Sequence, residues 1–469
     1  MDGKYKTLAK DTVIFAIGSL GSKLILFFLV PLYTNFLTRE EYGISELVTT
    51  FVQLLVPFAA ASINLALIRF GMKKDRRGAD VLKVSCVVLL LSLLVTFIFI
   101  PFLYLYKPIG PWKWYLIALI ILTNFSEVFK NYLKVLNRNR SFAVISILNT
   151  LVLALTNILL LTMFNLGIQG YLLANISALA FTTVVSFFVA RIPQELKAGK
   201  FDKALLKEML IYSFPLIFST VSWWVVHSSD KIMIEWLIGA SALGVYTAAS
   251  KIPSLINVIT GIFNQAWGLS SIREIESDKN AGFFTSVFNL FTTFLFGACI
   301  FLTSIIKPFM NVYVGSEFRE AWQFTPLLLS AAVFYSISAF LGSIYAALQK
   351  TKNDMFTSIL CAVINVAVNY FGIRALGVWG AVIGTISAYL VIALIRIFDM
   401  KRLMKFDIDL IRFFINLTLI LVQAVLVSLS WNILLVSVAV IAIYIAVNLN
   451  NLKLITGKLI GFVRKKNIK

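Results

Sequence analysis

Four positively charged side chains within long apolar runs of this chain are candidate ligand contacts. They are Lys23, Arg69, Lys130 and Lys251. A charge inside a hydrocarbon layer costs several kcal/mol, so such a residue is expected to face a cavity, a partner charge or a ligand. Lys23 and Lys251 lie deepest, one in each half of the sequence, and could bind an anionic group such as a diphosphate or an acidic sugar. Snorkelling toward the nearer membrane surface is the alternative for Arg69 and Lys130.

A polar stripe that starts in the apolar run 114–135 and continues beyond its end is the second candidate site. It consists of Asn124, Glu127, Asn131, Lys134 and Arg138. Spacings of three and four residues place all five on one face of a helix, and this face should line water and not lipid. The stripe could form an access path for a polar ligand from the cytoplasm. Packing within the helix bundle is the alternative, with ion pairs such as Lys130 with Glu127 or Lys23 with Glu46.

A third group of polar residues could couple transport to a cation. Asn365 and Asn369 are four residues apart and share a helix face, and Thr385 and Asp230 fall at compatible depths. Together they could offer oxygen ligands to Na⁺, and H⁺ is the other candidate coupling ion. Asn and Thr also join packed helices in membranes, so this alternative stays open.

These residues must be positioned by membrane-spanning helices. The chain has 469 residues, of which 59% are hydrophobic and 14% charged, with a mean hydropathy of +0.89. Runs of about 20 apolar residues are long enough to cross a bilayer as helices. Fourteen are predicted, at 12–35, 44–69, 82–105, 114–135, 143–164, 168–190, 209–229, 242–268, 282–306, 324–348, 355–373, 378–398, 410–429 and 432–449. The predicted fold is an all-α polytopic membrane protein.

An internal repeat organises these spans. Residues 132–157 align without a gap to residues 344–369, an offset of 212 positions, and after a slip of two residues 166–178 aligns to 376–388. Each repeat contains six spans, so the two copies are expected to be parallel across the membrane. The predicted domains are an N-terminal lobe (1–200), a C-terminal lobe (201–405), and two further helices with a basic tail (406–469).

Charge and motifs exclude several classes of function. Most of the 42 Lys and Arg residues fall in loops on the side of the N-terminus, which predicts that both termini are cytoplasmic. The formal net charge of +20 therefore reflects topology and not nucleic-acid binding. The three cysteines indicate no metal site, and no phosphate-binding loop is present. The single histidine, His227, is expected to be a hydrogen-bonded wall residue, so neither catalytic residues nor an enzyme are predicted.

Three stretches of the sequence resemble a known family. They are residues 31–70, residues 228–252 and the repeated LG-(I/V)-x-G signatures at 166 and 376. They are similar to the Wzx-like polysaccharide flippases of the multidrug/oligosaccharidyl-lipid/polysaccharide exporter superfamily. The resemblance covers residues 5–450 and implies a fourteen-helix carrier in the bacterial plasma membrane, surrounded by membrane lipids. The implied cargo is an undecaprenyl-diphosphate-linked oligosaccharide, turned from the inner to the outer leaflet by alternating access.

The resemblance also extends to coupling and to partners. The group Asp230, Asn365, Asn369 and Thr385 resembles the second-lobe sodium site of related lipid II flippases, with an Asn in place of a second carboxylate. A polysaccharide polymerase complex is an expected partner, and no cofactor other than the coupling ion is implied. A cation-coupled multidrug or metabolite antiporter of the same superfamily is the alternative. Basic residues outnumber acidic ones within the predicted spans, which favours the anionic cargo.

Overall fold

The computed structural model describes residues 21–73, 75–276, 281–404 and 408–466. Within these ranges the chain consists of helices joined by short connections, and no strand is present. Thirteen helices of the described chain are long and apolar enough to cross a membrane, and a shorter apolar helix, Gly21–Phe36, precedes them. The predicted all-α membrane fold is confirmed. The count of fourteen spans and the orientation stay predictions, and residues 12–20 of the first span, with Lys4, Lys6 and Lys10, lie outside the described residues.

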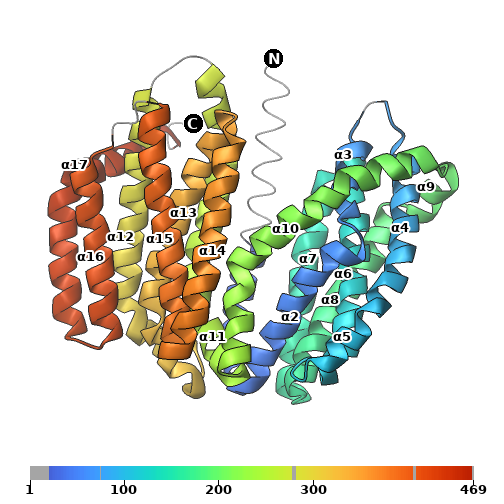
Figure 1. Cartoon of the computed structure of the whole chain (residues 1–469), viewed down its shortest axis with the longest axis horizontal. Helices are drawn as coiled ribbons and strands as arrows, with labels where there is room; N and C mark the ends of the chain where they lie inside the picture. Colours follow the sequence, from blue (N-terminus) through green and yellow to red (C-terminus); the bar gives the residue numbers. More distant parts are fainter. Residues whose placement is uncertain (1–20, 74, 277–280, 405–407, 467–469) are drawn as a thin grey trace. The chain divides into compact units, whose positions relative to one another are not determined.

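The chain divides into two compact units, Met1–Gly244 and Val245–Lys469. The first unit contains, after helix Gly21–Phe36, α2 (Arg39–Ala59), α3 (Ile63–Gly71), α4 (Gly78–Ile98), α5 (Ile100–Leu105), η1 (Gly110–Trp112), α6 (Lys113–Val135), α7 (Asn139–Ile158), η2 (Leu159–Met163), α8 (Gly167–Val189), α9 (Ile192–Ala198) and α10 (Lys203–Leu237) (Figure 1). The start of α11 (Ala240–Glu276) also falls in the first unit.

The second unit contains the rest of α11 and seven further elements. They are α12 (Ala281–Tyr313), η3 (Ser316–Gln323), α13 (Thr325–Ala347), α14 (Thr351–Leu376), α15 (Val378–Leu403), α16 (Leu410–Ser428) and α17 (Ile433–Lys466). The predicted domain limits at 200 and 405 follow the repeat and the basic linker and stay predictions.

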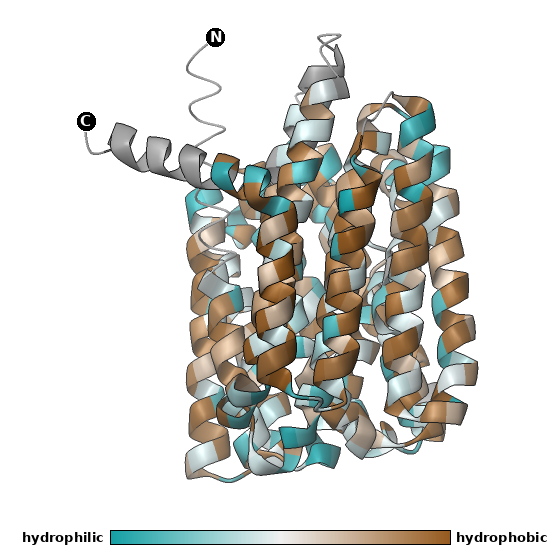
Figure 2. Cartoon of the chain, turned by 90° about the vertical axis from the view of Figure 1, so that its left-hand side faces the viewer, coloured by the Kyte–Doolittle hydropathy of each residue, from teal (hydrophilic) through white to brown (hydrophobic). Residues whose placement is uncertain are grey.

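Apolar side chains cover the outside of these helices. Figure 2 shows hydrophobic colour along the middle of the helices and hydrophilic colour gathering near their ends. Leu94 and Leu434 are 67% and 77% exposed. Such exposure is what a lipid-facing surface requires, because hydrocarbon solvates apolar side chains as well as a protein core does.

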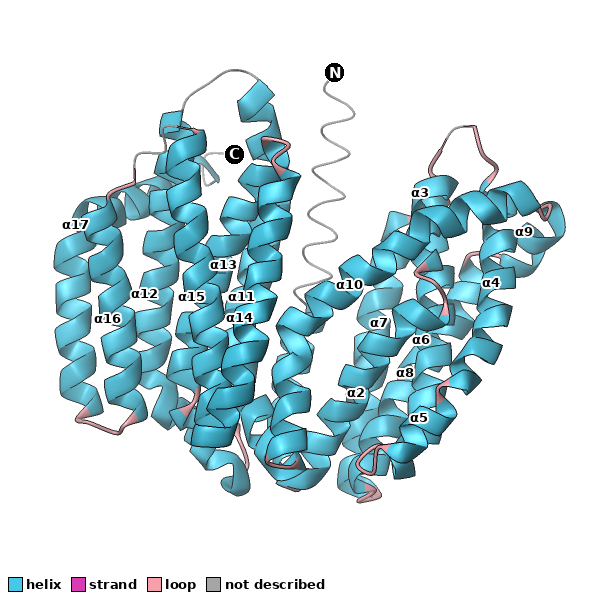
Figure 3. Cartoon of the chain, viewed as in Figure 1, coloured by secondary structure: helices cyan, strands magenta, loops and turns pink. Residues whose placement is uncertain are grey.

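The predicted continuous span 44–69 is wrong in one respect, since the structure breaks it into α2 and α3. Pro57 lies in the last turn of α2, and Ala61 and Ser62 have φ angles of 48° and 50°. The Ser62 amide donates a hydrogen bond to the Pro57 carbonyl oxygen at 3.0 Å, which closes the turn. Proline lacks the backbone N–H that a helix interior needs, and residues in the left-handed backbone conformation cannot continue a right-handed helix. The chain therefore starts a new helix at Ile63 (Figure 3).

The sequence repeat is also a repeat of backbone conformation. Asn137 and Gln349, which are 212 positions apart, have φ angles of 57° and 58°. The residues that follow them, Arg138 and Lys350, have φ and ψ of −93° and 54° and of −90° and 49°. Helices α7 and α14 begin directly after these turns. The offset found by aligning residues thus identifies two copies of one helix-turn-helix element.

Candidate functional site

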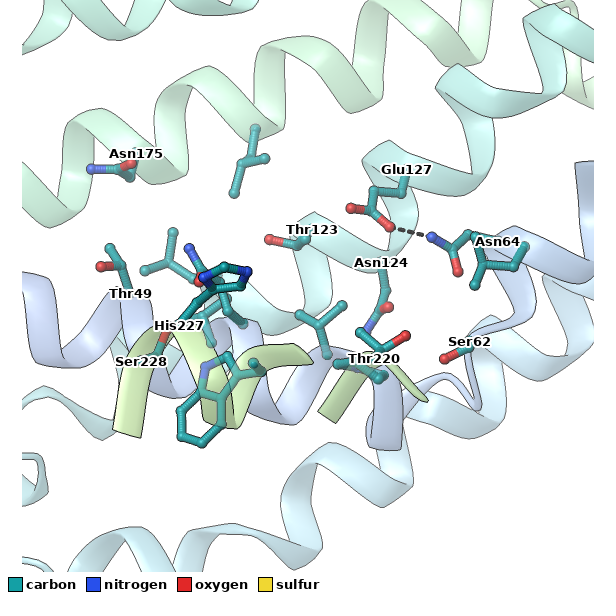
Figure 4. Close-up of a pocket in the computed structure, with 18 residues that line it drawn as sticks. Thr49, Ser62, Asn64, Thr123, Asn124, Glu127, Asn175, Thr220, His227 and Ser228 are labelled. Atoms are coloured by element: carbon teal, nitrogen blue, oxygen red, sulfur yellow. Dashed lines mark hydrogen bonds between the residues drawn. The ribbon is translucent and has the colours of Figure 1, made fainter. Parts of the chain in front are cut away.

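A pocket of about 570 Å³ lies within the first unit. Its walls come from α2, the start of α3, α6, α8 and α10, and its lining contains amides, hydroxyls, one indole, one imidazole and one carboxylate (Figure 4). A volume of roughly 300 to 1,000 Å³ is usual for sites that bind small molecules. The pocket lies among membrane-spanning helices, where unused polar groups are costly, so its polarity indicates a function.

Helix α6 supplies the polar side of the pocket. Thr123, Asn124 and Glu127 line the cavity from consecutive turns of this helix. The spacing of three residues between Asn124 and Glu127 puts both on one face, as the polar stripe of the sequence predicts. Two of the seven predicted substrate contacts are therefore brought together here.

The break between α2 and α3 positions the residue that holds Glu127. Asn64 lies in the first turn of α3, and its Nδ2 donates to Glu127 Oε2 at 2.5 Å. Ser62, at the break itself, lines the same side of the pocket. An uninterrupted helix over 44–69 would turn these two side chains elsewhere. The helix break is thus what allows the amide of Asn64 to reach the carboxylate, and the hydrogen bond is charge-assisted.

Within the part of the chain that the structure describes, the side-chain amide nitrogen of Asn124 donates no hydrogen bond. The residue is 5% exposed and lines the pocket, and its Nδ2 has no hydrogen-bond partner. A buried donor without an acceptor costs about 1 to 3 kcal/mol. Such a group is stabilised when an acceptor oxygen enters the cavity.

Helix α10 forms the opposite wall. Thr220, Trp224, His227 and Ser228 line the pocket with spacings that keep them on one helix face. The indole Nε1 of Trp224 donates to the backbone carbonyl of Thr50 in α2 at 3.1 Å, so the ring is anchored by its edge. His227 lines the pocket, as expected of a wall residue.

An ion pair joins α2 to α10 beyond the pocket. Lys231 Nζ lies 2.5 Å from Glu46 Oε1, and Glu46 is 9% exposed. The predicted alternative pairs Glu46 with Lys23; the structure shows Glu46 with Lys231, and the pairing with Lys23 stays a prediction. Lys231 follows the predicted span 209–229, whereas α10 continues to Leu237 and carries this cation into the packed part of the unit.

The predicted basic contacts lie outside this pocket, whose lining has no Lys or Arg. Lys23 is exposed on helix Gly21–Phe36, and Lys251 is half-buried in α11, in the second unit, where it has an interaction partner. Arg69 is exposed in the last turn of α3, with its guanidinium carbon 6.0 Å from the ring centre of Tyr212. Their roles as substrate contacts stay predictions.

The remainder of the α6 stripe contacts an aromatic ring. Lys130 and Lys134 place their Nζ atoms 5.4 Å and 4.1 Å from the ring centre of Phe142 in α7. Glu127 interacts electrostatically with both lysines, and no contact within ion-pair distance joins these described residues, so the pairing of Lys130 with Glu127 stays a prediction. Asn131 is half-buried and does not line the pocket. The stripe therefore divides into a pocket wall and a cation–π cluster.

The residues predicted to bind a coupling ion fall in different units. Asn365 and Asn369 are buried in α14, and Asn369 Nδ2 donates to Asn365 Oδ1 at 3.0 Å. The Oδ1 atom of Asn369 and the hydroxyl of Thr385 in α15 are buried without a hydrogen-bond partner. A Cβ at Gly384 would lie 2.0 Å from that Oδ1, so the helices meet closely there. Asp230 belongs to the first unit, and the joint ion site stays a prediction.

Sequence analysis missed a buried arginine in the second unit. Arg396 in α15 is 3% exposed, pairs with Asp354 at 2.7 Å, and donates to the Thr357 hydroxyl at 2.8 Å. Nearby, Asp399 accepts a hydrogen bond from the Tyr345 hydroxyl at 2.6 Å. The signal was present, because Arg396 lies inside the predicted span 378–398 and belongs with the other intramembrane cations. Asn64 and Trp224 were also missed, and nothing in their local sequence marks them.

Comparison with known proteins supports a transport function. A family model described as polysaccharide biosynthesis protein matches residues 8–268, more than half of the chain. The succinoglycan biosynthesis transport protein ExoT of Rhizobium meliloti (strain 1021) is 24% identical over 349 residues, which cover 72% of this chain and 68% of that protein.

Two solved structures share the fold. The lipid II flippase MurJ in an inward closed conformation has a TM-score of 0.67 and 16% identity, covering 96% of this chain and 100% of that one. An inward-facing multidrug resistance MATE family transporter of the MOP superfamily has a TM-score of 0.66 and 14% identity, covering 81% and 96%. At these identities the likeness establishes the fold alone.

Proposed function

The chain belongs to the polysaccharide biosynthesis protein family, and from that premise we propose that it carries a lipid-linked oligosaccharide across a membrane. The proposed cargo is an oligosaccharide on undecaprenyl diphosphate, turned from the inner to the outer leaflet of a bacterial plasma membrane. The observation that carries the proposal is the family match over residues 8–268, which spans every wall of the pocket.

The pocket has the physical properties that such a cargo needs. A sugar head group makes many hydrogen bonds in water and loses them in hydrocarbon. A cavity lined by amides and hydroxyls within membrane-spanning helices replaces those hydrogen bonds, while the polyprenyl tail stays in lipid. The family and fold are those of transporters and flippases, and no covalent step is required of the protein.

We propose that the cycle is one of alternating access. The head group enters from the cytoplasmic side, the carrier changes conformation, and the head group leaves on the outer side. Na⁺ or H⁺ would drive the cycle, with Asp230, Asn365, Asn369 and Thr385 as the proposed ion ligands. A polysaccharide polymerase complex would then use the exported units.

The test of this function is a deletion strain. Loss of the gene should make lipid-linked oligosaccharide accumulate in the inner leaflet, where a membrane-impermeant reagent added outside does not reach it. The purified protein in proteoliposomes should expose a fluorescent lipid-linked oligosaccharide to that reagent, and empty liposomes are the control. Absence of both effects would refute the proposal.

The same strain separates the alternative, a multidrug antiporter. Trp224 and Glu127 give the pocket one aromatic and one acidic group, which are the groups that organic cations require. An antiporter would lower the cellular level of ethidium and leave lipid-linked oligosaccharide unchanged. A flippase would leave the cellular level of ethidium unchanged and would lower the amount of lipid-linked oligosaccharide in the inner leaflet.

A further inference from the structure

We propose that the pocket of the first unit binds the uncharged sugar rings of the cargo, and that the diphosphate is held elsewhere. The inference rests on the proposed function and names the part of the cargo that this site recognises. It differs from the expectation that buried cations form the main substrate contacts. Four observations on the pocket carry it.

The first observation is the charge of the lining. Glu127 is the one acidic residue of the lining, and no Lys or Arg lines the cavity. A diphosphate carries negative charge and accepts hydrogen bonds, so a carboxylate in a site of low dielectric repels it. A sugar hydroxyl can donate to the same carboxylate, and hydrogen bonds to charged acceptors are stronger than neutral ones.

The second observation is the balance of donors and acceptors. Gln53, Asn64, Asn124 and Asn175 line the pocket with amides, each of which can donate and accept. Sugar hydroxyls also donate and accept, so amides suit them better than they suit a phosphate, which only accepts. Four amides and one carboxyl group therefore offer both donors and acceptors to the hydroxyls of a polyol.

The third observation is the unpartnered amide nitrogen of Asn124. This residue is 5% exposed, and its Nδ2 finds no acceptor among the described residues. A hydroxyl or ring oxygen of a sugar would supply one. The free energy of that hydrogen bond is gained only when the ligand is present, because the donor is otherwise unsatisfied.

The fourth observation is the fixed indole of Trp224. Its N–H is bound to the Thr50 carbonyl at 3.1 Å, which holds the ring as part of the wall. The C–H groups on one face of a pyranose pack against an aromatic face while the hydroxyls point sideways to polar groups. The amides of α2 and α6 are available for those hydroxyls.

Binding of simple probes to the purified full-length protein tests this inference. The sugar probes are neutral methyl glycosides of glucose, galactose, mannose and N-acetylglucosamine, and the diphosphate probe is farnesyl diphosphate. Affinity is measured by calorimetry in detergent. We expect at least one glycoside to bind, and we expect a saturating amount of farnesyl diphosphate not to displace it. Displacement, or no binding by any glycoside, would overturn the inference without any variant being made.

Variants then locate the sugar site. Asn124→Leu and Trp224→Leu should each weaken glycoside binding about tenfold, a loss typical of one hydrogen bond or one stacking contact in a binding site. Farnesyl diphosphate binding should not change. Asn35→Leu is the matched control, since Asn35 is exposed on helix Gly21–Phe36 and does not line the pocket. Unchanged glycoside affinity in both folded variants would overturn the inference.

The outcome is separable from the proposed function. If wild-type protein binds glycosides but does not expose lipid-linked oligosaccharide in proteoliposomes, the proposed function fails and the sugar site stands. If the protein transports lipid-linked oligosaccharide and Asn124→Leu binds glycosides normally, the sugar site fails and the proposed function stands.

Discussion

Helix α6 and its repeat counterpart α13 differ in what their corresponding positions contact. The offset of 212 residues places Thr123, Asn124 and Glu127 on Tyr335, Ser336 and Ala339. In the first unit these positions line a pocket. In the second unit Ser336 is fully buried and hydrogen-bonded to Thr260 at 2.7 Å, and the rings of Trp267 and Phe340 stack with centres 4.6 Å apart. Duplication thus preserved the helices, and side-chain size and polarity decide whether these corresponding positions of α6 and α13 line a pocket or a packed contact.

Each unit also has a cation near the start of its repeated hairpin, but the cation comes from a different helix in each unit. The repeat aligns Lys130 with Gly342, Phe142 with Asp354, and Ser186 with Arg396. In the first unit, Lys130 of α6 lies over Phe142. In the second unit, Arg396 of α15 pairs with Asp354, and a Cβ at Gly342 would lie 2.7 Å from Arg396 Nη1. A glycine on one helix therefore leaves the space that the arginine from the other helix occupies.

The largest expected effect distinguishes these two cations. Arg396→Met should lower stability by about 3 to 5 kcal/mol, because it leaves Asp354 and several acceptors without their partner. Lys130→Met should cost about 1 kcal/mol or less, as expected for a half-buried cation over a ring. The midpoint of thermal unfolding of each purified variant in detergent is the measurement. Equal losses would show that the two cations are equivalent.

Removing the partner as well should reverse part of the loss. Arg396→Met combined with Asp354→Leu should be more stable than Arg396→Met alone by about 1 to 2 kcal/mol, because no unpaired carboxylate remains. The gain is modest since the Asp354 side chain is 38% exposed in the native protein. The same unfolding measurement applies, and a double variant less stable than the single one would contradict the ion-pair interpretation.

The next effect distinguishes the pocket position on α6 from the corresponding packed position on α13. Asn124→Leu should lower the rate of lipid-linked oligosaccharide transport about tenfold, equivalent to about 1.4 kcal/mol, with folded protein retained. Ser336→Ala, at the corresponding position, should cost about 1 kcal/mol of stability and leave transport unchanged. Proteoliposome assays and thermal unfolding report the two quantities. Loss of transport in both variants would mean that the second unit also contributes a polar binding site here.

The smallest expected effect tests the repeated turn. Gln349→Gly should raise stability by about 0.5 to 1 kcal/mol, because glycine adopts a φ of 58° without strain. Asn137→Gly should change stability little, since asparagine tolerates this conformation better than glutamine does. A larger gain at Asn137 would show that the two turns are strained differently.

Hydrophobic runs predicted the fold well. The span predicted at 114–135 is α6, Lys113–Val135, and the span predicted at 168–190 is α8, Gly167–Val189. The family match confirms the resemblance to polysaccharide flippases, and the solved structures confirm the fold. The break at Ala61 and Ser62 was not predicted, because neither residue type favours a positive φ and their surroundings decide it.

The candidate site was predicted only in part. Asn124 and Glu127 were found because helical spacing is a property of one segment. Asn64 and Trp224 were not, because their roles depend on which helices pack together. The pairing of Glu46 with Lys231 was missed for the same reason, with 185 residues separating the partners. Periodicity identifies the polar face of a helix, and packing between helices decides what that face meets.

The absence of a side chain at Gly342 determines the order in which substitutions can occur in evolution. A lineage that moved the cation of the second unit from α15 to α13 would need a lysine at position 342 and the loss of Arg396. A Cβ at 342 would lie 2.7 Å from Nη1 of Arg396, and the ion pair and hydrogen bonds of the guanidinium oppose the shift that would make room, so we expect the arginine to be lost first. The intermediate then carries an unpaired Asp354 and is destabilised. A change from one arrangement to the other therefore passes through a less stable protein. This barrier would keep the charges of the two copies different.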